Sequence, residues 1–441
     1  MNCREKILSE DYMSILLDYV PEEANQEDEA FCYQQVDGTL GIYYLDRSAV
    51  LPLSPVNYLY RYLPQLFCLG AFPAAGSRTF RTEPLEDSGI LAQQRPPLEL
   101  TGRRVVMAFI DTGISYENPV FRYSDGSSRI LAIWDQTDQS GQSPEGFLYG
   151  TEYVREQIDR ALELEDPHSL VPEKDEIGHG TAVASVAAGS RLEEGSLFTG
   201  AAPDCEIVAV KLRPAKQYLR NFYLYPPEAE AFQENDVMMA IAFAISQAKK
   251  LKMPLSICLG IGSSQGAHLG TNALSQYVDY VANFSQVSVS VAAGNEGNTR
   301  NHSTGIFSQG REQIVTELRV AEREQGFTIE FWGEPPEIYE LSIQSPTGEI
   351  LEVSSSIGSR TQELSFVFVE TKVYVNYILI ERQTGYSLVY IRFFHPASGI
   401  WKIFTQARNQ QNVQFHIWLP VEGLISQDTY FLEDHPLTVR C

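Results

Sequence analysis

A histidine stands between two glycines in DEIGHGTAVASVAAG, residues 175–189, directly before a run of small residues with helical character. Gly178 and Gly180 remove side chains from around His179, and small residues let the following helix approach a sheet closely. The partial positive charge of a helix N-terminus favours the neutral imidazole, which is the form that a general base requires. Alone, His179 could equally be an ordinary histidine on a packed helix, so its partners decide the interpretation.

Asp111 and Asn295 are polar residues that each follow an expected buried strand. Asp111 comes directly after VVMAFI, residues 105–110. A carboxylate at the carboxyl end of a parallel strand lies where open α/β sheets bind ligands, and it could orient an imidazole. Asn295 follows VSVSVAA, residues 287–293, and its amide could donate to a developing oxyanion. Taken singly, each residue could also serve only a turn.

Together, the three residues form a more specific pattern. Asp111 lies in IDTG, His179 in GHGTAVASVAAG and Asn295 in AAGNEG, in that order along the chain. Over about residues 103–305 this pattern resembles the subtilisin-like serine peptidases, the subtilase family. The resemblance implies that Asp111 orients the imidazole, that His179 is the general base and that Asn295 is the oxyanion donor.

The substrate site is also implied by the resemblance. SICLG, residues 256–260, is similar to the family's strand along which a polypeptide substrate lies as an added β-strand. The implied substrate-binding residues are Cys258, Leu259 and Gly260, with cysteine where the family usually has serine. GISYENPVFRYSDGSSRILAIWDQT and GSSQGAHLG resemble most the clostridial spore-germination-protease-like subgroup, which includes inactive relatives. This subgroup implies an N-terminal prodomain and a jelly-roll insertion after the oxyanion asparagine.

The nucleophilic serine of the family, which lies in a GTSxAxP pattern, has no match in the sequence. GT pairs begin at residues 38, 150, 180 and 270, all before Asn295, and none continues as this pattern. We therefore expect that the segment with the serine is missing after LTVRC, residues 437–441, and that the 441-residue chain is inactive. The alternative is a pseudopeptidase that binds partners or signals without chemistry, which would have no need of the Asp, His and Asn residues.

Two other catalytic interpretations rest on short motifs. GSSQG, residues 262–266, fits the G-x-S-x-G elbow of α/β-hydrolases with Ser264 as nucleophile, but the acid and histidine of that motif follow the serine. DTG is also found in aspartic peptidases, which pair two carboxylates, whereas this sequence has a single DTG. No acidic cluster matches a calcium site, and we expect no metal or cofactor. The remaining histidines lack metal-ligand spacing and are interpreted as structural or solvated: His168, His268, His302, His395, His416 and His435.

The elements that would position these residues alternate between strand and helix from Arg104 to about Ser303. This alternation predicts an α/β fold, a doubly wound parallel sheet of subtilisin-like type that is incomplete at its C-terminal end. Strands are expected at 105–110, 206–212, 254–260 and 287–293, and helices at 151–165, 236–251 and 272–285.

From about Ile314 the pattern changes to short strands with period-2 alternation, which predicts a separate antiparallel β-sandwich or jelly-roll module. The tyrosine- and proline-rich residues before Arg104 give no clear elements. The expected organisation is a prodomain-like region (1–98), a catalytic domain lacking its C-terminal part (99–308) and a β-module (309–441). The β-module strands are expected at 327–331, 339–344, 365–369, 372–380, 388–394, 399–404 and 413–419.

Composition excludes several classes of protein. The chain has 441 residues, 44% of them hydrophobic, and a net charge of −24. Such an acidic chain is a poor candidate for binding nucleic acid or a membrane surface, and no apolar window is long enough to span a bilayer. The first residues lack the pattern of a signal peptide, and the six cysteines contain no CxxC pair. We therefore expect reduced thiols and a cytoplasmic location.

Overall fold

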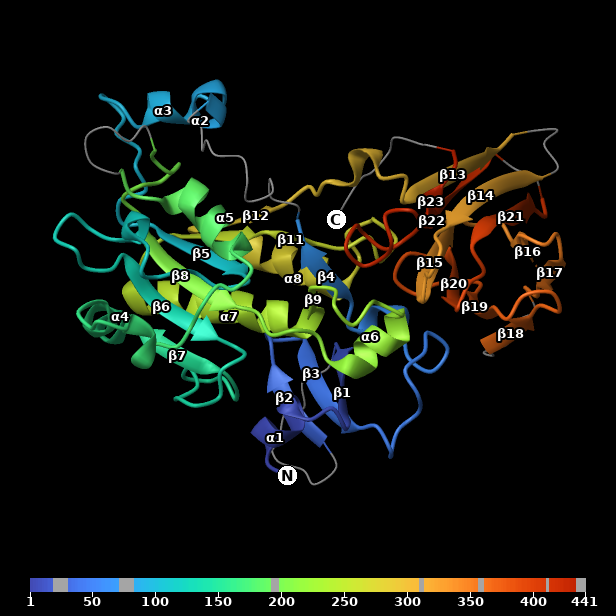
Figure 1. The fold of residues 1–441 in the computed structure, drawn as a ribbon, viewed down its shortest axis with the longest axis horizontal. Coiled ribbons are helices and arrows are strands. Elements are labelled where there is room, and N and C mark those ends of the chain that lie inside the picture. The colour runs from blue at the N-terminus through green and yellow to red at the C-terminus, as the bar shows by residue number, and fades with distance from the viewer. Residues whose placement is uncertain are drawn as a thin grey trace.

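A six-stranded, mostly parallel sheet forms the centre of the α/β part, which lies on the left in Figure 1. The computed structural model describes residues 1–18, 31–70, 83–191, 198–308, 313–355, 361–409 and 412–433. The strand order is β12-β10-β5-β8-β6-β7, and every neighbouring pair is parallel except β6 and β7. The strands are β5 (Val106–Asp111), β6 (Ile130–Asp135), β7 (Thr151–Val154), β8 (Glu206–Lys211), β10 (Leu255–Leu259) and β12 (Val287–Val291).

Helices cover both faces of this sheet, because successive side chains of a strand point to opposite faces. In β5, Val106, Ala108 and Ile110 pack into the cluster that contains α7, whereas Phe109 packs with Ala184 of α5. The mixed α/β architecture predicted from the sequence is therefore confirmed. The α-helices of this part are α4 (Arg155–Leu162), α5 (His179–Ala188), α6 (Gln217–Tyr223), α7 (Glu234–Leu251) and α8 (Ala273–Ala282). The short 3-10 helices are η2 (Pro119–Phe121), η3 (Pro167–Ser169) and η4 (Glu296–Asn298).

One predicted helix is partly wrong. The sequence predicts a helix over 151–165, but its first four residues form strand β7, which pairs with β6. Thr151 and Tyr153 are buried while Val154 is exposed, so the burial alternates with the period of a strand before the helix begins at Arg155. None of the helices in the described ranges is long and apolar enough to cross a membrane.

The N-terminal part, unassigned from the sequence, forms a small antiparallel sheet and then runs toward the central sheet. The small sheet has the order β1-β3-β2, and β4 pairs with β9 and β11 in a second three-stranded sheet. The elements of the N-terminal part are α1 (Cys3–Leu8), β1 (Tyr12–Leu17), β2 (Phe31–Gln35), β3 (Gly41–Asp46), η1 (Tyr60–Tyr62), β4 (Leu66–Leu69), α2 (Glu83–Asp87) and α3 (Ile90–Gln93). The two strands that pair with β4 are β9 (Ala231–Gln233) and β11 (Ile261–Gly262).

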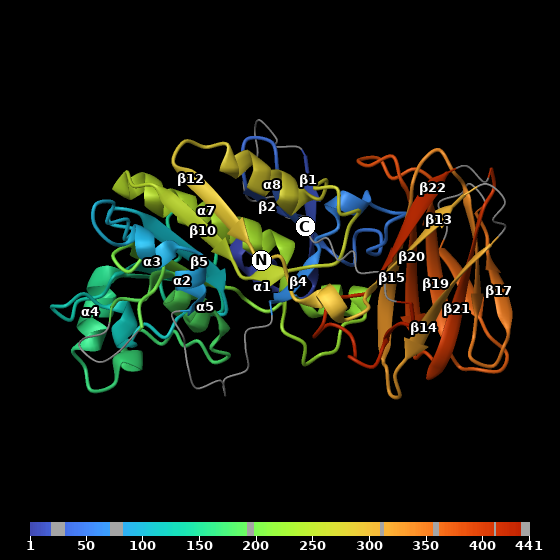
Figure 2. The ribbon, with the colours of Figure 1, turned by 90° about the horizontal axis from the view of Figure 1, so that it is seen from above.

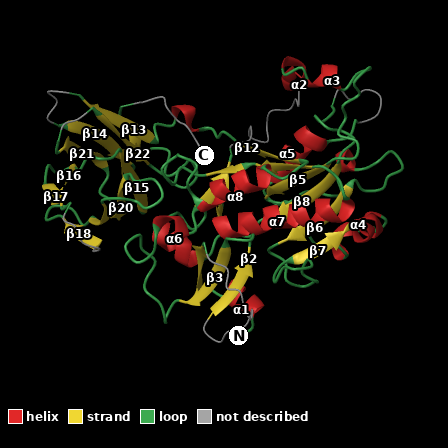
Figure 3. Cartoon of the chain, turned by 180° about the vertical axis from the view of Figure 1, so that it is seen from behind, coloured by secondary structure: helices red, strands yellow, loops and turns green. Residues whose placement is uncertain are grey.

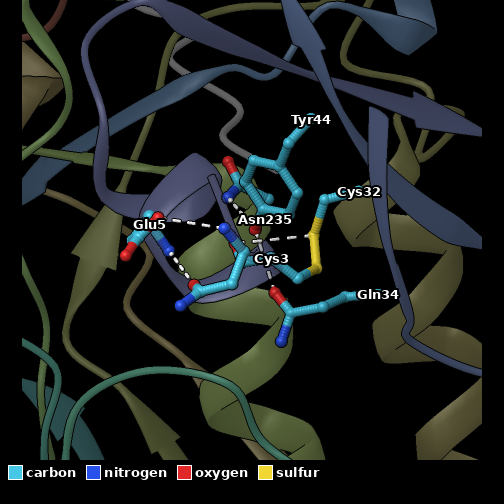
Figure 4. The surroundings of a disulfide bond; sticks show 7 residues. Cys3, Glu5, Cys32, Gln34, Tyr44 and Asn235 are labelled. Atoms are coloured by element: carbon cyan, nitrogen blue, oxygen red, sulfur yellow. Dashed lines mark hydrogen bonds between the residues drawn. A yellow bond between two sulfur atoms is a disulfide. The ribbon is translucent and has the colours of Figure 1, made fainter. Parts of the chain in front are cut away.

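A disulfide joins Cys3 and Cys32, so the expectation of reduced thiols is wrong for this pair (Figure 4). α1 packs against β2 and brings the two Cα atoms to 5.3 Å, within the usual range for a disulfide. Tyr44 lies beside the bond, where its hydroxyl donates to Gln34. Cys205 and Cys258 are free thiols, the thiol of Cys68 donates to the carbonyl of Glu422, and Cys441 is outside the described residues.

The C-terminal part consists of two antiparallel sheets that share one apolar core (Figure 2). Phe327, Ile329 and Phe331 are fully buried in that core, as their alternation predicted. The first sheet has the order β13-β22-β15-β20-β19-β18 and the second β17-β16-β21-β14-β23. Their strands are β13 (His302–Phe307), β14 (Ile314–Val320), β15 (Gly326–Gly333), β16 (Tyr339–Gln344), β17 (Ile350–Val353), β18 (Thr361–Ser365), β19 (Lys372–Ile378), β20 (Ser387–Phe394), β21 (Gly399–Ala407), β22 (Val413–Trp418) and β23 (Tyr430–Phe431).

Two expectations for this part need correction. The antiparallel pairing begins at His302, because β13 already pairs with β22, whereas the sequence suggested a β-module from residue 309. The predicted strand at 365–369 also fails, because β18 ends at Ser365. Val367 and Phe368 lie exposed beyond it, and their backbone N–H groups donate to the Glu349 carboxylate.

The β-rich part contacts the rest of the chain through a third apolar cluster. It combines residues of the N-terminal part, such as Leu66, with Phe222 of α6 and with Tyr390 of β20. The rings of Phe222 and Tyr390 stack with centroids 5.7 Å apart. Figure 3 shows α5, α7 and α8 beside the strands of the parallel sheet, strands and loops in the β-rich part, and α6 between these two regions.

Candidate active site

The predicted carboxylate and histidine lie side by side at the carboxyl end of β5. Asp111 is the last residue of β5 and His179 is the first residue of α5. Nδ1 of His179 is 2.7 Å from Oδ1 of Asp111, and the two side chains are 8% and 2% exposed. The contact predicted for this pair is therefore present, within hydrogen-bond distance. Their catalytic roles stay a prediction.

Two glycines allow this close approach. A Cβ atom on Gly180 would collide with the carbonyl oxygen of Gly113 and lie 3.1 Å from the Cβ of Asp111. A Cβ atom on Gly260 would lie 2.5 Å from Oδ2 of Asp111 and 3.2 Å from Cε1 of His179. The absent side chains therefore let α5 and the end of β10 close around the carboxylate.

The surroundings of His179 raise its pKa above the ordinary value for histidine. Burial by itself lowers this pKa, because it disfavours the charged ring. The hydrogen bond to Asp111 and the negative charge of Asp111 raise it, and so do a backbone hydrogen bond with Gly70 and the charge of Asp175. The raising effects win, so the imidazole gains protons readily, and it is a neutral base above its raised pKa.

The chain's own N-terminal part reaches this site. β4 pairs antiparallel with β11, with Leu69 opposite Ile261, and the next N–H, that of Gly70, donates to the carbonyl of Gly260 at 3.0 Å. A Cβ atom on Gly70 would lie 4.0 Å from Nδ2 of Asn295, so the asparagine amide is adjacent. Gly70 thus lies between Gly260, Asn295 and His179. Sequence reasoning missed Gly70, because its segment showed no clear element.

The three predicted substrate-binding residues fall into two groups. Cys258 and Leu259 lie within β10, whose two edges already pair with β5 and β12. Gly260 follows β10, and its carbonyl bonds to Gly70, so an extended chain does pair along this segment. Burial, and then the charge of Asp111, raises the pKa of Cys258 to about 11, so this residue is a neutral thiol at physiological pH rather than a reactive thiolate.

Ser264, the alternative nucleophile, lies in a different environment. It is 9% exposed, and its hydroxyl donates to the carbonyl of Leu419 at 2.6 Å. This carbonyl directly follows β22 of the β-rich part. The geometry commits the hydroxyl to a structural contact.

Three of the remaining histidines gather around one tryptophan, next to Ser264. We call this the histidine–tryptophan cluster, which consists of His268, His302, His416 and Trp418. The rings of His268 and His302 stack on Trp418 with centroid distances of 3.7 and 3.9 Å. These rings join a loop of the α/β part to β13 and β22, as expected for structural histidines. No group of three or more His, Cys, Asp or Glu side chains within the described ranges has the geometry of a metal site.

One carboxylate of the site was missed, although it lies close to His179 in the sequence. Asp175 lies four residues before His179 and accepts hydrogen bonds from Gly178 and Thr181 at the start of α5. An aspartate just before a helix that begins with polar and small residues is a capping signal, which would have found it.

The fold agrees with two comparisons with known proteins. Residues 102–316 match the subtilase family, Peptidase S8. The CspB protease of Clostridium perfringens has a similar structure, with a TM-score of 0.68 and 25% sequence identity over 81% of this chain and 70% of that chain. The α/β part of this chain, which carries Asp111 and His179 at the carboxyl end of its central sheet, thus matches the subtilase family, and both comparisons support a subtilisin-like serine peptidase.

Proposed function

We propose that the chain carries the acid, base and oxyanion groups of a serine-type endopeptidase and that the nucleophilic serine is not among its residues. The observation that carries the proposal is the buried pair of Asp111 and His179, with 2.7 Å between Oδ1 and Nδ1. Such a pair fixes the imidazole tautomer, because the proton on Nδ1 is held by the carboxylate. Nε2 is then the nitrogen that accepts a proton.

The proposed mechanism follows from these groups. Nε2 of His179 removes the proton of a serine hydroxyl as its oxygen attacks the carbonyl carbon of a peptide bond. Asp111 stabilises the imidazolium that forms, and the amide of Asn295 donates to the oxyanion of the tetrahedral intermediate. His179 then gives the proton to the leaving amine, which leaves an acyl-enzyme for water to hydrolyse. Asp111 stays ionised throughout.

The proposed substrate is a polypeptide that binds in an extended form as an added β-strand. Support comes from the chain's own segment, because β4 pairs with β11 and Gly70 bonds to Gly260 in the manner expected of such a strand. We further propose that residues 1–98 act as a prodomain, since Gly70 of this part lies beside His179. The β-rich part is proposed to be the jelly-roll insertion, and the catalytic sheet to be incomplete without a segment that carries the serine.

The second candidate is a pseudopeptidase that binds a partner without chemistry. The absence of a GTSxAxP pattern after Asn295 in the 441-residue sequence favours it. Asp111, His179 and Asn295 favour the peptidase, because binding alone does not require this combination. The cytoplasmic location predicted from the sequence stays a proposal beside either function.

A fluorophosphonate probe, which reacts with activated serines, separates these candidates. We expect no labelling of the 441-residue chain and peptide cleavage at background level, because no serine can form the acyl-enzyme. A chain extended by a segment with the GTSxAxP pattern should label and cleave, and a His179→Ala variant of it should lose both. An extended chain that never labels would support the pseudopeptidase. Labelling of the 441-residue chain that Ser264→Ala abolishes would contradict the proposal.

A further inference from the structure

Asp175 accepts four hydrogen bonds with its two carboxylate oxygens. Oδ1 accepts from the hydroxyl of Thr112 at 2.7 Å and from the backbone N–H of Gly178 at 2.8 Å. Oδ2 accepts from the backbone N–H of Thr181 at 2.8 Å and from its hydroxyl at 2.6 Å. Gly178 and Thr181 flank the start of α5, whereas Thr112 belongs to the loop after β5. One carboxylate thus joins the two elements that carry the candidate base and its acid.

Thr112 completes this connection. Its hydroxyl donates to Asp175 and accepts from the backbone N–H of Gly180 at 3.0 Å, while its own N–H donates to Oδ1 of Asp111 at 2.8 Å. Asp111 thus precedes Thr112 in the chain and also accepts a hydrogen bond from the N–H of Thr112. His179 lies between residues whose backbone N–H groups bond to Asp175 or Thr112. The side chains of Asp175 and Thr112 thereby fix the backbone on both sides of the pair.

We propose that Asp175 is a positioning residue, whose carboxylate holds the end of β5 against the start of α5 so that Asp111 and His179 face each other before substrate arrives. This proposal rests on the proposed role of His179 as general base. Asp175 itself touches neither ring nitrogen in this scheme and takes no part in proton transfer. Its effect passes through the backbone bonds of Gly178 and Thr181 and through the hydroxyl of Thr112.

The chemistry of a carboxylate suits this task better than that of an amide. Both oxygens of an ionised carboxylate accept, and bonds to a charged acceptor are about twice as strong as neutral ones. In Asp175→Asn one oxygen becomes an NH2 group, so two of the four donors lose their acceptor. Asp175 is half-buried, so donors left without an acceptor are only partly compensated by water.

The test measures the geometry of His179 directly, by NMR of the 441-residue chain labelled with ¹⁵N in histidine and glycine. The observables are the low-field Nδ1 proton of His179, which reports its bond to Asp111, and the exchange rate of the Gly180 amide. We expect Asp175→Asn and Thr112→Val to weaken or abolish the Nδ1 proton signal. Exchange at Gly180 should become roughly tenfold faster or more, as expected when such a bond is lost.

Two further variants separate positioning from other effects. Thr112→Ser keeps the hydroxyl and should restore both observables, which a purely steric role of threonine would not allow. Glu176→Gln removes the same charge from the next residue, which is exposed and is not a partner in these bonds. We expect Glu176→Gln to leave the Nδ1 proton and the Gly180 exchange unchanged. If Asp175→Asn does not fold, which circular dichroism will reveal, the Thr112 variants carry the test.

The proposal is overturned if Asp175→Asn and Thr112→Val fold and keep the Nδ1 proton and the slow Gly180 exchange. It is also overturned if Glu176→Gln has the same effect as Asp175→Asn, because charge alone would then explain it. Neither result depends on peptide cleavage. A failure of the positioning role can therefore be told apart from a failure of the proposed peptidase function, which the fluorophosphonate experiment tests.

Discussion

Two buried histidine environments in this chain shift the pKa of their imidazoles in opposite directions. At the candidate site, burial lowers the pKa of His179, but the bond to Asp111 and the charge of Asp111 outweigh this and raise it. In the histidine–tryptophan cluster, burial lowers the pKa of His416 and the charge of Glu334 only partly opposes it. The decisive difference is a carboxylate in hydrogen-bond contact with the ring.

The hydrogen bonds of the two regions fit these directions. Nε2 of His302 is 2.9 Å from Nδ1 of His416, and two rings can share such a bond only if one of these nitrogens lacks a proton. The pair therefore favours at least one neutral ring, and its stacking on Trp418 is compatible with a structural role. Histidine burial alone is thus no sign of a base, whereas a partner carboxylate is.

The largest effect is expected from Asp111→Asn, which should reverse the direction in which the pKa of His179 departs from its ordinary value. Without the carboxylate, burial becomes the leading effect, and the pKa of His179 should fall below the ordinary value, as that of His416 does. In the wild type, the raised folded-state pKa stabilises the protein fully below the unfolded-state pKa, and this contribution is lost as pH rises through the folded-state pKa. NMR titration of the histidine side chains measures both rings in one sample.

The same titration contains its own control. His416 should titrate identically in wild type and Asp111→Asn, because its lowered pKa comes from burial, opposed in part by Glu334. A His179 pKa that stays raised in Asp111→Asn would show that the carboxylate is not what separates the two environments.

The second prediction addresses the cluster. Trp418 is 7% exposed and lies against the rings of His268 and His302. Trp418→Ala should lower the free energy of unfolding by about 3–5 kcal/mol, the range for removing a buried aromatic side chain. Trp418→Phe keeps a ring in the stack and should cost less. Urea unfolding gives these values, and the Nδ1 proton of His179 should persist in both variants if the two regions are independent.

The sequence predicts those parts of the site that depend only on short, local segments. Asp111 ends a continuous apolar strand and His179 begins a helix of small residues, so each position follows from a short segment and the α/β alternation brings them together. Asp175 is within reach of the same reasoning, because its capping bonds span only a few residues.

Other features depend on contacts between distant segments. Gly70 meets Gly260 only because β4 crosses to β11, and nothing in the composition near Gly70 indicates that pairing. The Cys3–Cys32 disulfide likewise depends on how α1 packs against β2, over a sequence separation of 29 residues. Strand β7 was hidden because its four residues run directly into a helix with strong helical periodicity.

The smallest effect extends the comparison to Glu173, a carboxyl of the site region that lacks the stabilising partners of Asp111. Glu173 is 1% exposed, its Oε1 accepts from the N–H of Ile114, and its Oε2 has no hydrogen-bond partner among the described residues. Burial raises the pKa of Glu173 to about 8, from 4.5. The folded state therefore binds a proton that the unfolded state releases, and stability should fall as pH rises from about 4.5 through about 8.

Glu173→Gln should flatten this decline, because the amide stays neutral at every pH and keeps an oxygen for Ile114. A tenfold change in a proton-binding constant corresponds to about 1.4 kcal/mol, and we expect the variant to recover an amount of that order near pH 8. Urea unfolding at a series of pH values measures the slope. Glu176→Gln, with its exposed position, should retain the wild-type slope. Because burial also raises the pKa of Glu234, to about 7, and the pKa values of Glu330 and Glu152, part of the decline should remain in Glu173→Gln. Equal slopes in wild type and Glu173→Gln would mean that Glu173 is ionised in the folded protein. The burial of Glu173 would then not distinguish its protonation state from that proposed for Asp111.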